Sequence, residues 1–141
     1  MSQLCFIDTN IVVYANDGRD PEKQIIAQNL LKKLIPSNQA AISSQVLQEF
    51  CNVMLKGDKP FMRLSDLRVV LLEVLLPIMR HSPDATFYVQ ALDLINRHSL
   101  GWYDSLIVQA AVELHCDVLY TEDLQDGQQF GKLKVVNPFN T

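Results

Sequence analysis

Apolar residues occur along the chain either in short runs or at helical spacing. Four short, mostly apolar runs are typical of strands buried on both faces of a sheet, at residues 4–7, 40–43, 117–120 and 133–136. Five longer stretches favour helices, at about residues 20–34, 44–56, 65–79, 84–97 and 102–115. This alternation predicts an α/β fold with a short parallel sheet of about four strands, covered by helices on both faces.

Polar residues mark where several of these helices begin. Asp20 is suited to cap a helix whose first residue is Pro21. Ser44 is expected to be the N-cap of the helix that follows the second strand, and Asp84 opens a later one. We find no repeat, low-complexity tract or linker, so residues 1–141 are expected to form a single domain.

Composition and charge narrow the function classes. The 141 residues are 48% apolar and 20% charged, as in ordinary soluble globular domains. The formal charge of −4 disfavours a protein that grips duplex DNA broadly by neutralising its phosphates. Three widely spaced cysteines without a C-x-x-C pair, and the lack of a signal peptide, predict a reducing cytoplasm. The most apolar run, residues 69–79, is too short to span a membrane, so no membrane association is expected.

Four acidic residues occur where parallel strands or their following helices would place them together. Asp8 directly follows the first strand and Asp123 follows the third, so both are expected at one edge of the sheet. Glu49 lies in the helix after the second strand, and Asp104 lies in the first turn of an almost wholly apolar helix. Each acid alone could be a turn former or a helix cap.

Taken together, the four acids indicate a metal site. Carboxylates that converge without a basic partner repel one another strongly. A hard divalent cation removes that conflict, and Mg²⁺ or Mn²⁺ prefers oxygen ligands of this kind. Such sites commonly serve phosphate chemistry, in which the metal activates a water molecule and stabilises the developing charge.

The segments around these acids resemble the motifs of PIN-domain nucleases. The opening motif is residues 6–11, and the other three acidic motifs are residues 47–50, 103–107 and 121–128. The ending at residues 136–139 is similar to the bacterial branch of that family, and the likeness is greatest to VapC-type toxins. The resemblance implies a PIN-like fold and a Mg²⁺-dependent endoribonuclease, the toxin of a type II toxin–antitoxin pair, inhibited by a cognate antitoxin.

The same resemblance assigns roles to individual residues. It makes Asp8, Glu49, Asp104 and Asp123 the catalytic and metal-site acids, with Asp8 and Asp104 as the first choice for direct ligands. Polar neighbours suited to orienting these carboxylates, or serving only as caps and turns, are Thr9, Asn10, Ser44 and Thr121.

Other residues are candidates for contacts with RNA or with a protein. Lys56, Lys59 and Arg63 form a basic cluster that either contacts RNA phosphates or is simply a solvated face. Trp102 and Tyr103 could stack on a base, although core packing is the more common role. The helix at residues 65–79 is apolar on most sides, which fits a homodimer interface, a bound antitoxin segment or a central core helix.

Two other functions compete with the nuclease. A catalytically silent PIN-like module that binds protein or RNA would need none of the four acids. A small phosphatase of the haloacid-dehalogenase type would carry a second aspartate two residues after the first, where this chain has Asn10. The sequence therefore favours the nuclease.

Overall fold

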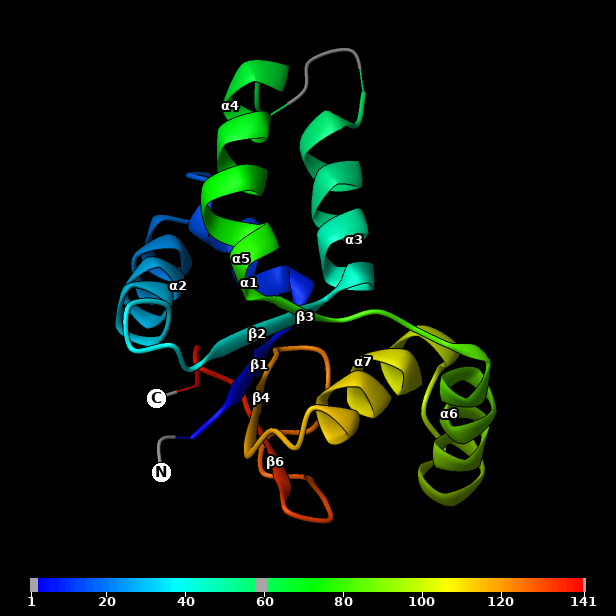
Figure 1. Cartoon of the computed structure of the whole chain (residues 1–141). Helices are drawn as coiled ribbons and strands as arrows, with labels where there is room; N and C mark the ends of the chain where they lie inside the picture. The colour runs from blue at the N-terminus through cyan, green and yellow to red at the C-terminus, as the bar shows by residue number, and fades with distance from the viewer. Residues whose placement is uncertain (1–2, 58–60, 141) are drawn as a thin grey trace.

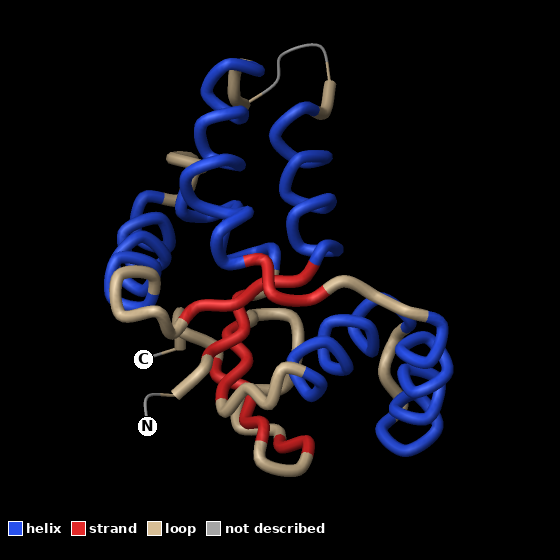
Figure 2. Tube along the Cα trace, viewed as in Figure 1, coloured by secondary structure: helices blue, strands red, loops and turns tan. Residues whose placement is uncertain are grey.

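A six-stranded sheet lies at the centre of the computed structural model, which describes residues 3–57 and 61–140 (Figures 1 and 2). Its strands are β1 (Cys5–Ile7), β2 (Ala40–Ser43), β3 (Met79–His81), β4 (Val118–Tyr120), β5 (Gln129–Phe130) and β6 (Leu133–Val136). The order across the sheet is β3-β2-β1-β4-β6-β5, and every neighbouring pair is parallel except β5 and β6. The predicted α/β class with a mostly parallel sheet is confirmed.

The strand order reverses between β1 and β4. From β1 the chain moves outward through β2 to β3, and then returns to β4 on the other side of β1. Phe6 of β1 pairs with Ala41 of β2 on one side and with Leu119 of β4 on the other. In open α/β sheets, such a reversal leaves a crevice at the carboxyl ends of the two strands, where ligands bind.

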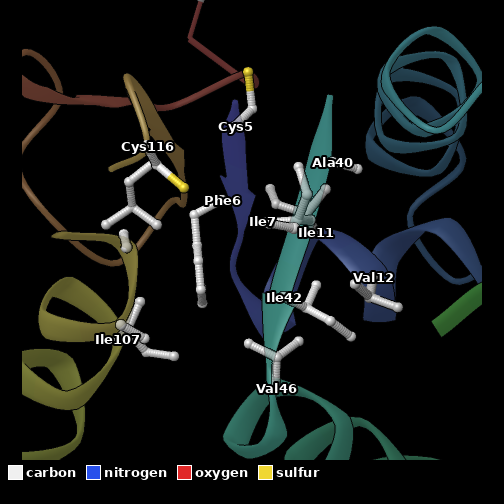
Figure 3. Packing of buried hydrophobic residues seen from close by; sticks show 14 of the residues in the cluster. Cys5, Phe6, Ile7, Ile11, Val12, Ala40, Ile42, Val46, Ile107 and Cys116 are labelled. Carbon is white, nitrogen blue, oxygen red and sulfur yellow. The ribbon is translucent and has the colours of Figure 1, made fainter. Parts of the chain in front are cut away.

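Helices cover both faces of the sheet (Figure 1). One face carries α1 (Thr9–Ala15), α2 (Pro21–Leu34), α3 (Ser44–Leu55), α4 (Leu64–Val70), the π-helical turn η1 (Leu71–Leu75) and α5 (Leu76–Ile78). The other face carries α6 (Ala85–His98) and α7 (Trp102–Glu113). Figure 3 shows Phe6 on the side of Ile107 of α7, with Ile7 and Ile11 packed on the opposite side. Residues of β1 are buried on both faces, which explains their continuous apolar run.

Two of the three predicted helix caps are confirmed and one is wrong. Asp20 accepts a hydrogen bond from the Lys23 backbone N–H at 3.2 Å, and Asp84 accepts one from Phe87 at 2.9 Å. The cap of α3 is Ser43 and not Ser44, because β2 runs as far as Ser43. The Ser43 backbone is extended, and its hydroxyl accepts from the backbone N–H of Val46 at 3.4 Å.

The helix predicted at residues 65–79 is interrupted. It consists of α4, η1 and α5, and Met79 already belongs to β3. Pro77 has no backbone N–H, and its ring crowds the carbonyl one turn earlier, which explains the widened π-helical turn before it. Strands β3 and β5 and helix α1 were not predicted because each is too short to show a period, so the sheet has six strands and not about four.

Two further observations concern the cysteines and the lengths of the helices. Cys5, Cys51 and Cys116 are free thiols, and the first and last are buried. Within residues 3–57 and 61–140, the helices are all too short or too polar to cross a lipid bilayer.

Candidate active site

Asp8 lies where β1 passes into α1, at the reversal of the strand order. Its carboxylate accepts a hydrogen bond from the backbone N–H of Thr9 at 2.6 Å and from the hydroxyl of Thr121 at 2.8 Å. The residue is only 6% exposed. Burial, together with the negative charges of Asp123 and Glu49, raises the pKa of Asp8 to about 7 despite both hydrogen bonds. The fold therefore holds the Asp8 carboxylate in a place where its negative charge is unfavourable.

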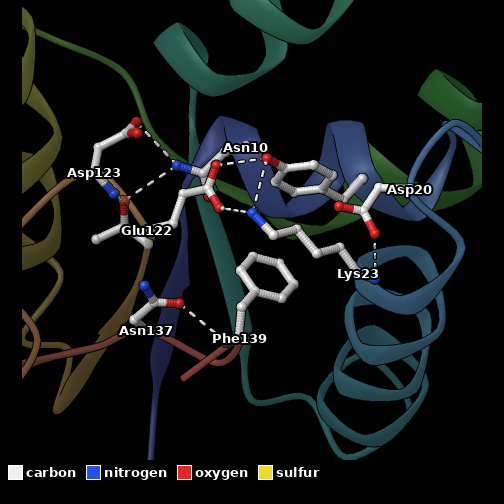
Figure 4. A network of polar contacts seen from close by, with 9 residues as sticks. Asn10, Asp20, Lys23, Glu122, Asp123, Asn137 and Phe139 are labelled. Atoms are coloured by element: carbon white, nitrogen blue, oxygen red, sulfur yellow. Dashed lines mark hydrogen bonds and ion pairs between the residues drawn. The ribbon is translucent and has the colours of Figure 1, made fainter. Parts of the chain in front are cut away.

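Thr121, directly after β4, connects Asp8 to Asp123. Its side chain is fully buried, and its hydroxyl oxygen accepts from the backbone N–H of Asp123 at 3.1 Å and from the side-chain amide of Asn10 at 3.2 Å. The same Asn10 amide donates to the Asp123 carboxylate at 3.0 Å (Figure 4). These contacts fix the exposed Asp123 beside the buried Asp8.

Glu49 reaches the same edge from the second turn of α3. The hydroxyl of Thr9 donates to its carboxylate at 2.7 Å, so Thr9 contacts Asp8 through its backbone and Glu49 through its side chain. Gln45, one turn earlier on α3, lies 3.5 Å from the same Glu49 oxygen.

Asp104 approaches from the opposite face of the sheet, in the first turn of α7. Burial raises the pKa of its carboxyl, and the negative charges of Asp123 and Glu49 raise it further. Asp8 experiences the same two charges, so Asp123 and Glu49 lie within electrostatic reach of both Asp8 and Asp104. The structure thus brings together all four acids predicted from the sequence.

The chemistry of this site fits a hard divalent cation. Its charged donors are all carboxylate oxygens, and no ion pair within the described residues involves any of the four acids. Three of the acids are held by Thr9, Thr121 and Asn10. Within residues 3–57 and 61–140, no group of three or more acidic, His or Cys side chains forms a cage that could hold a metal ion. Mg²⁺ commonly binds through one or two carboxylates and keeps several water molecules, so it needs no such cage.

The predicted supporting residues fall into two groups. Thr9, Asn10 and Thr121 all hydrogen-bond to the site acids. Ser44 does not do so within the described residues, and instead it lines a neighbouring pocket at the start of α3.

In the basic cluster, Lys56 and Arg63 are exposed near the end of α3 and the start of α4, whereas Lys59 lies outside the described residues.

Glu122 is a site neighbour whose role the sequence does not reveal. Its sequence context indicates a solvated loop acid, but its carboxylate accepts from the Tyr14 hydroxyl at 2.6 Å and from the Lys23 ammonium at 2.9 Å (Figure 4). The Lys23 ammonium also lies over the rings of Tyr14 and Phe139, at 4.8 and 5.2 Å from their centroids. The network ties α1, α2 and the end of the chain to the loop that carries Asp123. No local motif marks it, because its members are separated by long stretches of sequence.

Removing the Tyr14 hydroxyl should loosen that loop. Tyr14→Phe keeps the ring that packs against Phe139. It removes the hydrogen bond to the Glu122 carboxylate at 2.6 Å and the longer one that the Lys23 ammonium donates to the Tyr14 hydroxyl at 3.3 Å. Because the bond is to a charged acceptor in a partly exposed network, we expect a loss of about 1 kcal/mol in unfolding free energy. Thermal and urea unfolding, with the exposed Tyr88→Phe as the control, measure it. Equal stability of Tyr14→Phe and wild type would show that the network does not secure the loop.

Comparison with known proteins identifies the family. The profile of the PIN domain matches residues 5–128, which include all four acids. The chain belongs to the PIN domain family. PIN domains are generally nucleases, and the resemblance found in the sequence is thereby confirmed at the level of the family.

Solved structures share this PIN fold at low sequence identity. FitAcB from Neisseria gonorrhoeae superposes with a TM-score of 0.65 at 20% identity, covering 98% of this chain and 100% of that one. FitAB bound to an IR36 DNA fragment gives 0.67 at 20% identity, with coverages of 98% and 97%. VapBC2 from Rickettsia felis, bound to a DNA fragment from its promoter, gives 0.59 at 23% identity, with coverages of 94% and 96%. No curated protein sequence matches the chain.

Proposed function

We propose that this PIN domain is a Mg²⁺- or Mn²⁺-dependent endoribonuclease and the toxin component of a type II toxin–antitoxin pair. In this role, residues 1–141 form one nuclease domain that acts in the reducing cytoplasm. The observation that carries it is the convergence of four carboxylates, without a basic partner among the described residues, at the carboxyl ends of β1 and β4.

Each acid then has a role set by its surroundings. Asp8 and Asp104 hold the ion, because their raised pKa values show carboxylates whose charge is poorly compensated by the protein. In this proposal Glu49 and Asp123 complete the acidic pocket by binding the ion through water or by holding a second ion. The bound cation supplies Lewis acidity for attack of water on the RNA phosphodiester. Thr9, Asn10 and Thr121 keep the carboxylates oriented.

Cleavage of single-stranded RNA in Mg²⁺, abolished by EDTA and restored by excess Mg²⁺, tests this function. The competing function is a catalytically silent PIN-like module that only binds RNA or protein. Such a module would bind RNA equally with Mg²⁺ or EDTA and leave it intact, and that result would overturn the proposed activity.

The basic cluster should contribute to RNA binding through phosphates. Lys56→Ala combined with Arg63→Ala is expected to weaken RNA binding. It should also make the slope of log affinity against log salt concentration less steep, by about 0.7 for each phosphate that the protein no longer neutralises. Metal affinity should stay unchanged, because neither residue pairs with any of the four acids. Fluorescence anisotropy of labelled RNA at several salt concentrations measures the slope, with Lys32→Ala and Lys33→Ala as the control pair. An unchanged slope would show that the cluster is only a solvated face.

An exposed apolar surface on α4, η1 and α5 fits the proposed protein contacts. Leu64, Val69, Leu72 and Leu76 are between 42% and 72% exposed, so this segment is not the central core helix that the sequence allowed. The similar FitAcB, FitAB and VapBC2 structures are named as complexes of two components. We propose that the surface is covered by a second subunit of a homodimer or by the cognate antitoxin.

A charge placed in that surface should break the assembly. Leu72→Lys is expected to convert the dimer to a monomer in analytical ultracentrifugation, or to weaken antitoxin binding. The stability of the monomer should not fall, because the Leu72 side chain is 57% exposed. Val89→Lys on α6, at a position that is 61% exposed, is the matched control. A monomeric wild type at high concentration, whose antitoxin affinity Leu72→Lys leaves intact, would contradict both forms of the contact.

A further inference from the structure

A pocket of about 250 Å³ lies beside the acidic site, at the carboxyl ends of β2 and β3. Residues from four segments line it, among them Ser43, Gln45, His81, Tyr88, Trp102 and Tyr103. Gln45 joins the pocket to the site, since its side-chain amide lies 3.5 Å from Glu49 and 3.4 Å from the backbone oxygen of Tyr103. Trp102 and Tyr103 also directly precede Asp104 on α7. A molecule in the pocket would therefore lie next to the four acids.

Exposed aromatic rings form one wall of the pocket. Tyr88 of α6 and Trp102 of α7 are nearly parallel, with an interplanar angle of 19° and centroids 6.3 Å apart. They are 43% and 39% exposed, and Tyr103 is 66% exposed, so the core packing expected for Trp102 and Tyr103 is wrong. Flat aromatic faces open to solvent beside a phosphate-directed site are suited to stacking on a base.

His81 is a nearly buried residue of the lining. It is 8% exposed, and its Nε2 lies 2.8 Å from Glu113. Glu113 also accepts from Gln109 at 3.0 Å, and a carboxylate only accepts, so the His81 proton belongs on Nε2. The Nδ1 of His81 is buried and has no hydrogen-bond partner among the described residues. Because this nitrogen is closed to solvent in the described structure, the aromatic wall, and not Nδ1, is the surface that a ligand in the pocket would contact.

We propose that this pocket binds one unpaired nucleobase of the RNA strand whose phosphodiester lies at the acidic site. The proposal rests on the proposed function. The volume is just below the range of about 300–1,000 Å³ found for sites of drug-sized ligands, which suits a single planar ring system. With a formal charge of −4, the protein has little general attraction for phosphates, so base stacking would supply much of its hold on RNA.

Trp102 is the only tryptophan of the chain, and its fluorescence therefore reports on this wall directly. We would titrate wild type in EDTA with a short single-stranded oligoribonucleotide, with nucleoside 5′-monophosphates and with ribose 5-phosphate. The expected result is a saturable fluorescence change with the oligonucleotide and the nucleotides but not with the sugar phosphate. Tyr88→Ala should weaken oligonucleotide binding about 5- to 150-fold, and Tyr88→Phe should restore it. Val89→Ala, an exposed change on the same helix outside the pocket, is the control.

The outcomes separate this proposal from the nuclease assignment. A wild type that binds nucleotides at Trp102 but does not cleave RNA in Mg²⁺ would support the pocket and overturn the proposed activity. A wild type that cleaves RNA, with Tyr88→Ala unchanged in affinity and fluorescence, would overturn the pocket alone. A fluorescence change with an antitoxin but not with any nucleotide would also overturn it, because the occupant would then be a protein side chain.

Discussion

Asparagine in place of Asp104 is expected to lower the rate of RNA cleavage in Mg²⁺ by at least ~10²-fold, as does loss of other groups that stabilise a transition-state charge. The change removes one negative charge from a site where Asp123 and Glu49 already raise the pKa of the Asp104 carboxyl. Rates under single-turnover conditions measure the effect. Asp93→Asn, the same change on the exposed surface of α6, is the control and should cleave at the wild-type rate. Wild-type cleavage by Asp104→Asn would remove Asp104 from the site.

Asp104 is a cleaner target than Asp8 for this experiment. The Thr121 hydroxyl donates to Asp8 while both of its acceptor positions are used by Asn10 and Asp123. An amide at position 8 would present N–H groups either to that hydroxyl or to the backbone N–H of Thr9. Asp8→Asn should therefore disturb the fold as well as the metal site, whereas Asp104 makes no side-chain hydrogen bond in the described structure.

In EDTA the folded protein should lose stability as the pH rises from about 4 to about 7. The folded pKa of Asp8 lies above its unfolded value of 3.8, at about 7, so the folded state holds the proton more tightly than the unfolded chain. The contribution of Asp8 to stability is therefore full below pH 4 and falls until pH 7, by up to roughly 4 kcal/mol. Asp17 and Asp126, whose pKa values are lowered by hydrogen bonds from Arg19 and Asn137, act with the opposite sign below about pH 4.

Mg²⁺ should reverse that loss at neutral pH. A cation that binds only the folded state adds about 2.7 kcal/mol at a concentration of ~100 Kd. Asp104→Asn should be more stable than wild type in EDTA at pH 7, yet gain less from Mg²⁺, because it has lost both a repulsive charge and a ligand. Melting curves at several pH values, with EDTA and with Mg²⁺, test both effects. If Asp104→Asn melts below wild type in EDTA and both respond equally to Mg²⁺, Asp104 is a structural residue.

The sequence predicted the acidic site because its members follow a topological rule. Asp8 and Asp123 come closely after strands of the buried sheet, and the carboxyl ends of parallel strands share an edge. Glu49 and Asp104 lie on helices that start near that edge, so their positions in the sequence also predicted that these two acids lie near Asp8 and Asp123. Of the polar partners predicted for these acids, Thr9, Asn10 and Thr121 hydrogen-bond to them, whereas Ser44 lines the neighbouring pocket.

What the sequence could not show depends on contacts between distant segments. The ion pair of Lys23 with Glu122 spans 99 residues and has no local signature. The strands β3 and β5 have three and two residues, too few to show an alternating pattern. The pocket beside the site depends on α6 and α7 meeting β3, which leaves Trp102 exposed although its segment looks like core.

Binding of Mn²⁺ to the folded protein, followed by the loss of the free-ion signal in electron paramagnetic resonance, tests the central assignment most directly. The acids at the carboxyl ends of β1 and β4 should give wild type a saturable Mn²⁺ site. Added Mg²⁺ should displace the Mn²⁺ from it. The double variant Asp104→Asn with Asp123→Asn, confirmed as folded by circular dichroism, should lose that site, while Asp93→Asn keeps it. Saturable binding that survives in the folded double variant, or no binding by wild type, would contradict the assignment of these carboxylates as a metal centre.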